Sequence, residues 1–563
     1  MPSTTIDDQD SSRLVNPTRA RDWLFGTCAA GIILMAFLMR TFRIGEQEVW
    51  LDEAASFHMA VTTQWLGSAA LNENTPPLYD LFLRLWLGLV SWSDASLRIP
   101  SAVFGTLFVL AVIWVGKEVF DQRVGLWSGF WAAVNPHHIY YSQEARAYSL
   151  LALTLVLTYL ALWHALKVNT WRRWALVSAC MLLSLYSNYL AILGLIPTVF
   201  LVLSWPKIDS KPQICFRFGA ALFLSVLLFL PWYLGSFVMT THSGAGIFWI
   251  PQAWENTPPL LAIPKTLEVF GLGSQAGLLS IPLKQYSHLE FPASLRFMGL
   301  AGLIGMAIWV AGSWKERTLG IPQLRMRKLW LAVQLFFPLC LLWVVSFYKP
   351  IYVAGRYDFV AFPAFPLLLG LAFAKTQIGA PCGRVLAPLL TLILLIPIGA
   401  KLFLYYNADS PRPDEEIALT IDTYADQGDV IIFSGIRRLP VIYYLNRLGF
   451  RWENGYCVKT TPYRLVPCPM FPRESVLYTP VYNSSRLFNS PDAARADLQD
   501  MVSMLKSPQN ALWVVCGYFN RRTGQILFGR SEMLLFAELE RAGFIRSLFP
   551  RLPGILEFHQ RAE

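Results

Sequence analysis

Charged residues are scarce in this chain of 563 residues, because Asp, Glu, Lys and Arg together make up 15% of it. Soluble domains usually carry about 25%. Hydrophobic residues make up 55%, and uncharged apolar runs recur from residue 23 to about residue 405, which is typical of membrane-spanning helices. The net charge of +10 is better explained by basic loops on the cytoplasmic side of a membrane than by a nucleic-acid partner.

Several short motifs are also missing. Neither CxxC nor HExxH occurs, so the sequence indicates no metal site and no cofactor. Neither GxGxxG nor GxxxxGK[ST] accompanies a predicted strand, which leaves no sign of a nucleotide site. Two of the 8 cysteines, Cys457 and Cys468, could form a disulfide on an oxidising face of the membrane, although their spacing alone leaves this open.

The polar N-terminal tail, residues 1–22, does not have the pattern of a cleavable signal peptide. Arg13, Arg19 and Arg21 precede the first apolar run, which predicts a cytoplasmic N-terminus. Residues 174–206 carry no charge and would form a helix of roughly 50 Å, so we expect two short spans joined by an outer turn near residues 186–189. The transmembrane domain, residues 23–405, is thus predicted to contain about eleven spans, at 23–41, 99–116, 124–136, 148–166, 174–206 (two), 218–238, 294–313, 329–347, 359–374 and 385–404.

The apolar segment 76–92 is predicted not to cross the membrane. Pro76 and Pro77 open it, and Asp80 and Arg84 interrupt it, which leaves a stretch too short for a span. If it did cross, the basic loops up to residue 206 would face outward, against the positive-inside rule. We therefore expect a helix that lies in the outer membrane interface.

Residues 406–563 are predicted to form a soluble domain on the outer face. Its predicted helices are PDEEIALTIDTYADQ, RLPVIYYLNRLG and SEMLLFAELERAGF, and its predicted strands are DVIIFSG and NALWVVCGYF. This alternation favours a small α/β domain. The predicted fold is therefore mainly α: a polytopic membrane helix bundle with interfacial helices on the outer face and a C-terminal soluble α/β domain.

Three loops meet on the predicted outer face, and each carries charged or aromatic side chains. The first, residues 42–57, holds four carboxylates next to the first span. Three alternatives remain open: residues 42–57 could be a plain solvated loop, Glu144 and Arg146 a plain ion pair, and Arg356 an interface anchor. The side chains are Glu46, Glu48, Asp52 and Glu53 in the first loop, His137, His138, Tyr140, Tyr141, Gln143, Glu144 and Arg146 in the second, and Lys349, Tyr352, Arg356 and Tyr357 in the third.

Carboxylates and cations at a membrane surface suit one class of reaction. A carboxylate can take a proton from an acceptor hydroxyl, and Arg or Lys can neutralise a phosphate leaving group. A lipid-linked phosphosugar presents its phosphate at that depth. Asp52 within WLDEA is the first candidate for the base, because an acid beside apolar residues at a membrane is costly without a role. The two histidines at a helix end are expected at the interface rather than in catalysis.

A family resemblance follows from four motifs in order: WLDEA, PPLYDLFLRLW, LRIPSAVFGTLFVLAVIWVGKEVF and NPHHIYYSQEARAYSLLAL. The chain resembles the C-type membrane glycosyltransferases over about residues 20–375. More narrowly, it is similar to the glycosyltransferase family 39 and aminoarabinose-transferase-like group, which includes the protein O-mannosyltransferases. The C-terminal domain resembles the outer domains of that group only loosely.

The resemblance implies a polyprenyl-phosphate-sugar donor, an inverting transfer on the outer leaflet and an Asp base in the first loop. That base maps to Asp52, with Glu53 beside it, and the second acidic position maps to Glu144. Arg356 and Tyr357 are the counterparts of the residues near the donor phosphate, with Lys349 and Arg146 as further cations. In one departure, Thr75 precedes the two prolines where relatives have His, and Asp80 replaces a Tyr, which puts the contacts of that segment in doubt.

The sequence therefore predicts an integral glycosyltransferase of the plasma (inner) membrane, with lipid, polysaccharide or protein as acceptor. The long loop 239–292 is expected to close over the site, as mobile loops often do. Two rivals stay open. A transporter or flippase of lipid-linked sugars would place charges near mid-span, and a scaffold with an outer binding domain would tolerate loss of the first-loop acids.

Overall fold

The structure is a computed structural model of the whole chain. It describes residues 17–62, 75–206, 210–243, 251, 254–255, 257–274, 291–315, 322–376, 381–408, 412–425, 429–433, 438–453, 456–459, 464–467, 499, 502, 505, 509–515, 518–520, 525–527, 530–547 and 555–560. Part of the loop 239–292, which was predicted to close over the site, falls outside these residues, and so does Cys468.

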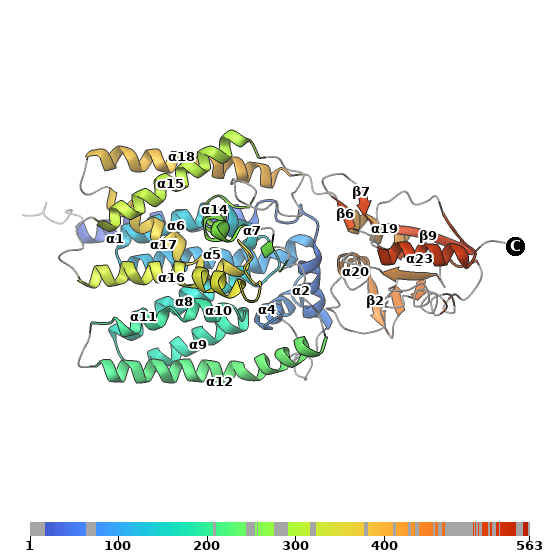
Figure 1. Cartoon of the computed structure of the whole chain (residues 1–563), viewed down its shortest axis with the longest axis horizontal. Helices are drawn as coiled ribbons and strands as arrows, with labels where there is room; N and C mark the ends of the chain where they lie inside the picture. Colours follow the sequence, from blue (N-terminus) through green and yellow to red (C-terminus); the bar gives the residue numbers. More distant parts are fainter. Residues whose placement is uncertain are drawn as a thin grey trace, which may run out of the picture.

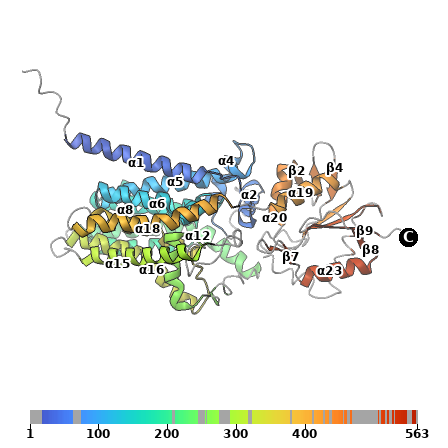
Figure 2. The same ribbon diagram turned by 90° about the horizontal axis from the view of Figure 1, so that it is seen from above.

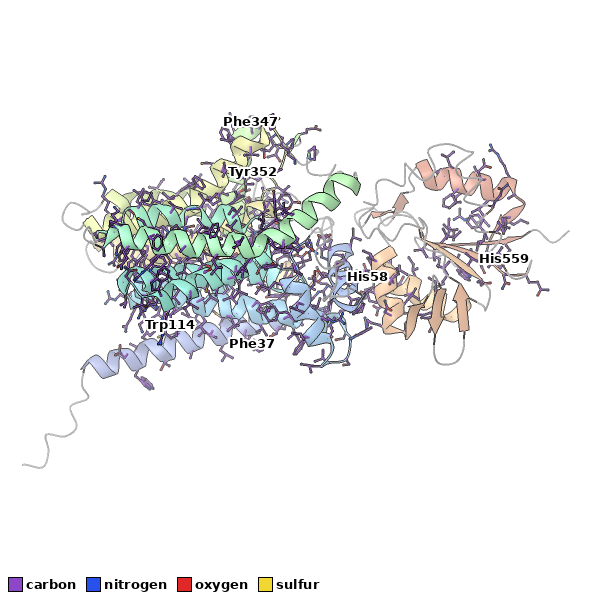
Figure 3. All side chains as sticks on the ribbon, turned by 90° about the horizontal axis from the view of Figure 1, so that it is seen from below. Phe37, His58, Trp114, Phe347, Tyr352 and His559 are labelled. Atoms are coloured by element: carbon purple, nitrogen blue, oxygen red, sulfur yellow. The ribbon has the colours of Figure 1, made fainter. Side chains whose placement is uncertain are left out.

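A bundle of long, roughly parallel helices makes up most of the molecule (Figure 1). Within the described residues, 6 of its helices are long and apolar enough to cross a membrane, which confirms the prediction of a multi-pass membrane protein. Phe37 and Trp114 lie on the outside of the bundle (Figure 3), where lipid would cover them. The helices are α1 (Pro17–Thr41), α5 (Asp94–Val119), α6 (Gln122–Val134), α8 (Tyr148–Lys167), α9 (Trp171–Ser187), α10 (Ala191–Leu195), α11 (Thr198–Leu203), α12 (Lys211–Ser243), α15 (Ala293–Lys315), α16 (Pro322–Ser346), α17 (Ala364–Thr376) and α18 (Pro381–Tyr406).

The uncharged stretch 174–206 is broken as predicted. Helix α9 ends at Ser187 and α10 begins at Ala191. Between them, the side-chain oxygen of Asn188 accepts a hydrogen bond from the backbone N–H of Leu190 at 2.9 Å, a local bond that competes with helix continuation. The chain therefore turns back close to the expected residues.

Short helices gather at one end of the bundle, where α2 (Leu51–Thr62) lies across the ends of the long helices and α4 (Leu78–Leu87) and α7 (Pro136–Ser142) are close by (Figure 1). Helix α4 has 10 residues and a length of about 15 Å, which is too short to cross a membrane. Its buried residues Tyr79, Asp80, Leu83 and Leu87 lie on one face at helical spacing. The segment 76–92 thus forms no spanning helix, as predicted, whereas its place in the outer membrane interface stays a prediction.

The connections between α12 and α17 also reach this end. They include η1 (Pro259–Leu261), α14 (Ala262–Leu272) and η3 (Tyr357–Ala361). Helix α14 contacts both α7 and α16. These short elements carry the third predicted outer loop to the same end of the bundle as α2.

The C-terminal part has α/β structure beyond the end of the bundle that carries α2 (Figure 2). Its main sheet has the strand order β1-β5-β9-β8, in which β1 and β5 are parallel and the other pairs are antiparallel. Every predicted helix and strand of this part is found, whereas its boundary at residue 406 stays a prediction. The elements are α19 (Pro413–Tyr424), β1 (Val430–Phe433), α20 (Arg438–Arg447), β2 (Phe450–Glu453), β3 (Tyr456–Lys459), β4 (Arg464–Pro467), β5 (Leu512–Val515), β6 (Tyr518–Asn520), β7 (Gln525–Leu527), α23 (Arg530–Arg541), β8 (Phe544–Arg546) and β9 (Ile555–Gln560).

Candidate active site

A buried ion pair shapes the first outer loop. The guanidinium of Arg98, on α5, donates to both carboxylate oxygens of Glu53, on α2, at 2.7 and 2.6 Å. Its other N–H groups donate to the backbone carbonyls of Ile44, Gln47 and Glu48 at 2.8–3.0 Å. Both side chains are almost fully buried, at 3% and 1% exposure. The loop before α2 is therefore folded around Arg98.

Glu53 was predicted to take part in catalysis, with a solvated side chain as the alternative. The structure shows that it is not solvated. One carboxylate oxygen also accepts from the backbone N–H of Ala145 at 2.9 Å, and the other from that of Trp50 at 3.4 Å. With its oxygens engaged in this way, Glu53 is suited to holding two outer loops together rather than to taking up a proton.

Asp52 lies beside Glu53 in sequence but faces a different partner. Its carboxylate forms an ion pair with the guanidinium of Arg356, from the third outer loop. Both side chains are partly exposed, at 21% and 27%. Arg356 also donates through Nε to the hydroxyl of Tyr148 at 3.0 Å, and its guanidinium carbon lies 5.9 Å from the centre of the Trp50 ring. The structure thus joins residues that are 304 positions apart in the chain.

Arg146 reaches the same place from the second outer loop. Its Nη1 donates to the backbone carbonyl of Asp52 at 3.3 Å and to the hydroxyl of Ser56 at 3.2 Å. The positive charge of Arg146 therefore lies close to the Asp52–Arg356 pair. Neither of these two bonds involves the Asp52 carboxylate.

Glu144 is buried next to these charges, at 4% exposure, and its Oε2 has no hydrogen-bond partner. Burial and, to a smaller extent, the negative charges of Glu53 and Asp52 raise its pKa to about 8, against the opposing effect of Arg356 and Arg146. The Glu144 side chain is therefore mostly protonated at neutral pH, and a protonated carboxyl can donate a hydrogen bond.

The position of Arg356 is fixed by the turn that precedes it. Gly355 has a positive φ of 77°, a conformation that glycine adopts without strain, and an added Cβ would lie 2.7 Å from Cγ1 of Val269. The Gly355 carbonyl accepts from the Tyr141 hydroxyl at 2.5 Å, and its N–H donates to Asp358 at 3.0 Å. Asp358 is fully buried and also accepts from the hydroxyl of Thr266.

Tyr357 and Lys349, the other two predicted phosphate ligands, differ in how far they are buried. Tyr357 is half-buried at the start of η3, and burial and the neighbouring Tyr189 raise its pKa, while the neighbouring Arg356 lowers it. Lys349 follows α16 with an exposed side chain. Among the described residues, no side-chain hydrogen bond or ion pair joins Lys349 to Asp52, Glu144 or Arg356.

His137 and His138 were expected at the membrane interface, and this expectation is wrong. Both are buried, at 3% and 0% exposure. The His138 ring stacks on Phe108, with ring centres 4.3 Å apart, and its Nδ1 lies 2.9 Å from Nη2 of Arg40. Asn135 begins the short helix α7 as its N-cap, and this helix turns the two rings into the core.

Sequence reasoning missed several residues of this site. Arg98 gave a signal, because it is a lone cation at the start of an apolar run, within the LRIPSA motif. Tyr148 and Trp50 gave none, since tyrosine and tryptophan are common at membrane interfaces. Asp358 gave no signal either. Within the described residues, no three or more His, Cys, Asp and Glu side chains gather as a metal-binding group.

Sequence and structure comparisons show which known proteins this chain is similar to. Residues 74–234 match the family model described as dolichyl-phosphate-mannose-protein mannosyltransferase. The structure is similar to that of ArnT from Cupriavidus metallidurans in the apo state, with 11% sequence identity, a TM-score of 0.55 and coverage of 96% of this chain and 98% of that one. This chain has the C-type glycosyltransferase fold. A search of curated protein sequences finds no match.

Two further structures share the C-type glycosyltransferase fold. ArnT bound to undecaprenyl phosphate gives the same TM-score of 0.55 at 11% identity, with 97% of this chain and 99% of that one covered. The archaeal oligosaccharyltransferase AglB from Archaeoglobus fulgidus, in complex with an inhibitory peptide and a dolichol-phosphate, gives a TM-score of 0.51 at 12% identity over 96% of this chain and 74% of that one. The family resemblance predicted from the motifs is confirmed, and at these identities it concerns the fold.

Proposed function

We propose that this protein is an integral membrane glycosyltransferase that moves a sugar from a polyprenyl-phosphate-linked donor to an acceptor hydroxyl, with inversion at the anomeric carbon. The observation that carries the proposal is the pairing of a partly exposed carboxylate, Asp52, with a partly exposed guanidinium, Arg356, at one end of a membrane bundle. A base and a phosphate-binding cation side by side are what a direct displacement of a phosphate requires.

In the proposed reaction, the donor phosphate binds the guanidinium of Arg356 and so takes the place of the Asp52 carboxylate. Asp52 is then free to accept the proton of the acceptor hydroxyl. The hydroxyl oxygen forms a bond to the anomeric carbon, the bond from that carbon to the phosphate oxygen breaks, and the polyprenyl phosphate leaves with the electron pair. Arg356 neutralises the charge that develops on the phosphate. Electrostatic stabilisation of this kind is usually the largest single contribution to catalysis.

The neighbouring residues take supporting roles. Arg146 adds a second positive charge beside Asp52, and Tyr148 and Tyr357 orient the Arg356 guanidinium or the phosphate. Glu144, protonated at neutral pH, is placed to donate a hydrogen bond to donor or acceptor rather than to act as the base. Lys349 is assigned only an outer contact with the phosphate, because its side chain is exposed.

The similar structures support the choice of donor. One was determined with undecaprenyl phosphate and another with a dolichol-phosphate, and both molecules are polyprenyl phosphates. The matched family is described by a dolichyl-phosphate sugar donor. Together with the distribution of basic loops, this supports a site on the extracytoplasmic face of the plasma (inner) membrane, with the N-terminus in the cytoplasm and the C-terminal domain outside.

A transfer assay with the purified protein tests the proposal. The protein is incubated with a panel of radiolabelled polyprenyl-phosphate sugars and a membrane extract as the source of acceptors, and Asp52→Asn serves as the matched control. We expect label to move from at least one donor to extract material with the wild-type protein only. Movement of intact donor across vesicle membranes without any transfer would instead indicate a transporter and contradict the proposal.

A further inference from the structure

One buried carboxylate of the membrane bundle accepts hydrogen bonds from the C-terminal domain. Asp94, in the first turn of α5, is 4% exposed. It accepts hydrogen bonds from Arg447 at 2.6 Å, Tyr443 at 3.0 Å, Tyr444 at 3.3 Å and Arg412 at 3.3 Å. All of these donors belong to α20 or directly precede α19, so Asp94 is a point at which the two parts of the molecule are joined.

The same donors also hold the backbone of the loop that leads to Asp52. The Tyr444 hydroxyl accepts from the N–H of Val49 at 2.9 Å. Nη2 of Arg412 donates to the carbonyls of Gly45 and Glu46, both at 2.8 Å. Because Val49 is fully buried, its N–H needs such a partner, and an unpaired buried N–H would be costly. The loop conformation thus depends on groups supplied by the C-terminal domain.

A contact in the opposite direction ties the loop to the start of α19. Oε1 of Glu48 accepts from the backbone N–H of Asp414 at 2.7 Å, and Asp414 lies in the first turn of that helix. A carboxylate at a helix N-terminus satisfies a free N–H and interacts favourably with the helix dipole. Glu48 is 3% exposed, so this bond is formed away from bulk water.

Apolar side chains of α2 also pack against the C-terminal domain. The ring of Phe57, on α2, meets the ring of Tyr443 edge-on with centres 4.9 Å apart. One hydrophobic cluster contains residues of α2, α4, α19 and α20, and His58 of α2 lies where the bundle meets the C-terminal domain (Figure 3). The C-terminal domain and the helix that begins with Asp52 therefore share one core.

We propose that Tyr444 is a positioning residue for Asp52, an inference that rests on the proposed function. Its hydroxyl accepts from Val49 and donates to Asp94, so it links the bundle, the C-terminal domain and the loop in one chain of hydrogen bonds. Val49 lies three residues before Asp52. Tyr444 thereby fixes where α2 begins and where the Asp52 carboxylate meets its partners.

The neighbouring tyrosine provides a matched control. Tyr443 also donates to Asp94, but its hydroxyl makes no bond to the loop backbone among the described contacts. We compare Tyr444→Phe with Tyr443→Phe, which each remove one hydroxyl and keep the ring. The measurements are amide hydrogen exchange over residues 45–53, donor KM and kcat, and the melting temperature of the full-length protein in detergent.

For Tyr444→Phe, we expect the Val49 amide to exchange roughly fivefold faster or more, as loss of one net hydrogen bond implies. We also expect kcat to fall by about tenfold or more, because small displacements of a catalytic group are costly, while donor KM stays within about twofold. Tyr443→Phe should leave both exchange and kcat close to the wild-type values. Arg412→Ala, which removes the bonds to Gly45 and Glu46, should act in the same direction as Tyr444→Phe.

Equal exchange and equal kcat for the two tyrosine variants would overturn the proposal, since Tyr444 would then serve only to attach the C-terminal domain. If Tyr444→Phe does not fold, the comparison of Arg412→Ala with Tyr443→Phe decides in the same way. If the wild-type protein transfers no sugar from any donor, the proposed function fails separately, and the exchange comparison still decides whether Tyr444 holds the loop.

Discussion

The guanidinium of Arg356 is paired with the carboxylate of Asp52, although 304 residues separate them in the chain. Each group limits the other, because a carboxylate that is bound to a cation is a weaker base. A donor phosphate that competes for Arg356 would therefore both be bound and increase the basicity of Asp52. This coupling makes the two residues the first targets for mutation.

Asp52→Asn should remove nearly all transfer while donor binding is kept. The amide has the size and shape of the carboxylate, but it cannot accept the proton of the acceptor hydroxyl. General base catalysis typically contributes about 10²–10⁴-fold, and we expect a loss of kcat in that range. The measurement is turnover with fixed donor and acceptor, with a thermal melt as the control for folding. Near-normal turnover in a well-folded variant would exclude Asp52 as the base.

Arg356→Ala should weaken use of the donor strongly. Loss of one contact to a developing phosphate charge costs about 2–4 kcal/mol in the barrier, and Arg356→Lys should recover only part of it, because Lys lacks the planar fork of Arg. Lys349→Ala is the comparison and should cost clearly less, since that side chain is exposed and outside the Asp52 cluster. The measurement is kcat/KM for the donor. An equal loss in Lys349→Ala and Arg356→Ala would shift the phosphate site towards Lys349.

Glu53→Ala should destabilise the protein, in contrast to Asp52→Asn. It leaves the buried Arg98 guanidinium without its carboxylate, and removal of one partner of a buried ion pair costs about 3–5 kcal/mol. Glu46→Ala is the control, because the Glu46–Arg43 pair is exposed and such pairs contribute little. The melting temperature in detergent should fall clearly for the first variant and hardly for the second. Equal melting temperatures would show that Glu53 is dispensable for folding.

Glu144 should make stability depend on pH. Burial raises its pKa from 4.5 to about 8, so the folded protein binds this proton more tightly than the unfolded chain does. The resulting contribution to stability is fully present below the unfolded pKa and is lost as the pH rises to about 8. Glu144→Gln stays neutral, so between about pH 5 and about pH 9 the melting temperature of the wild type should fall relative to that of this variant. A constant difference would contradict a raised pKa for Glu144.

The proposed orientation can be tested at two exposed positions at opposite ends of the bundle. In a cysteine-free background, Glu46→Cys lies at the end with the candidate site, and Arg172→Cys lies in the first turn of α9 at the other end. An impermeant thiol reagent should label the first in intact cells and the second only after lysis, as the distribution of basic loops predicts. The reverse pattern would place the site in the cytoplasm.

The 6 long apolar helices could be predicted because each is encoded locally, whereas the total of about eleven spans stays a prediction. A run of about twenty uncharged residues or the lack of any charge in residues 174–206 is visible without knowledge of neighbouring helices. The two histidines were misjudged for the opposite reason. The polarity of a histidine suggests an interface, and only the tertiary structure provides the stack on Phe108 and the bond from Arg40 that make burial of His138 favourable.

Asp52 and Glu53, the adjacent acids of WLDEA, show the same limit of prediction from sequence. Two adjacent acids are equivalent in the sequence, and the helix of α2 turns them in different directions, by about 100° per residue. The partner that each one meets, Arg98 for Glu53 and Arg356 for Asp52, comes from a different and distant part of the chain. Spacing in the sequence carries no information about such partners.

The sequence by itself determined the membrane bundle, the absence of a spanning helix in 76–92, the secondary structure of the C-terminal part and the three loops that hold the candidate residues. These features follow from local composition, periodicity and charge, which act over one helix or one loop. Only the tertiary structure decided which acid is buried and which is partly exposed, and that Tyr444 holds the loop before Asp52. Those outcomes depend on burial and on pairing between residues that are 45 to 395 positions apart, and these arise only when the chain is folded.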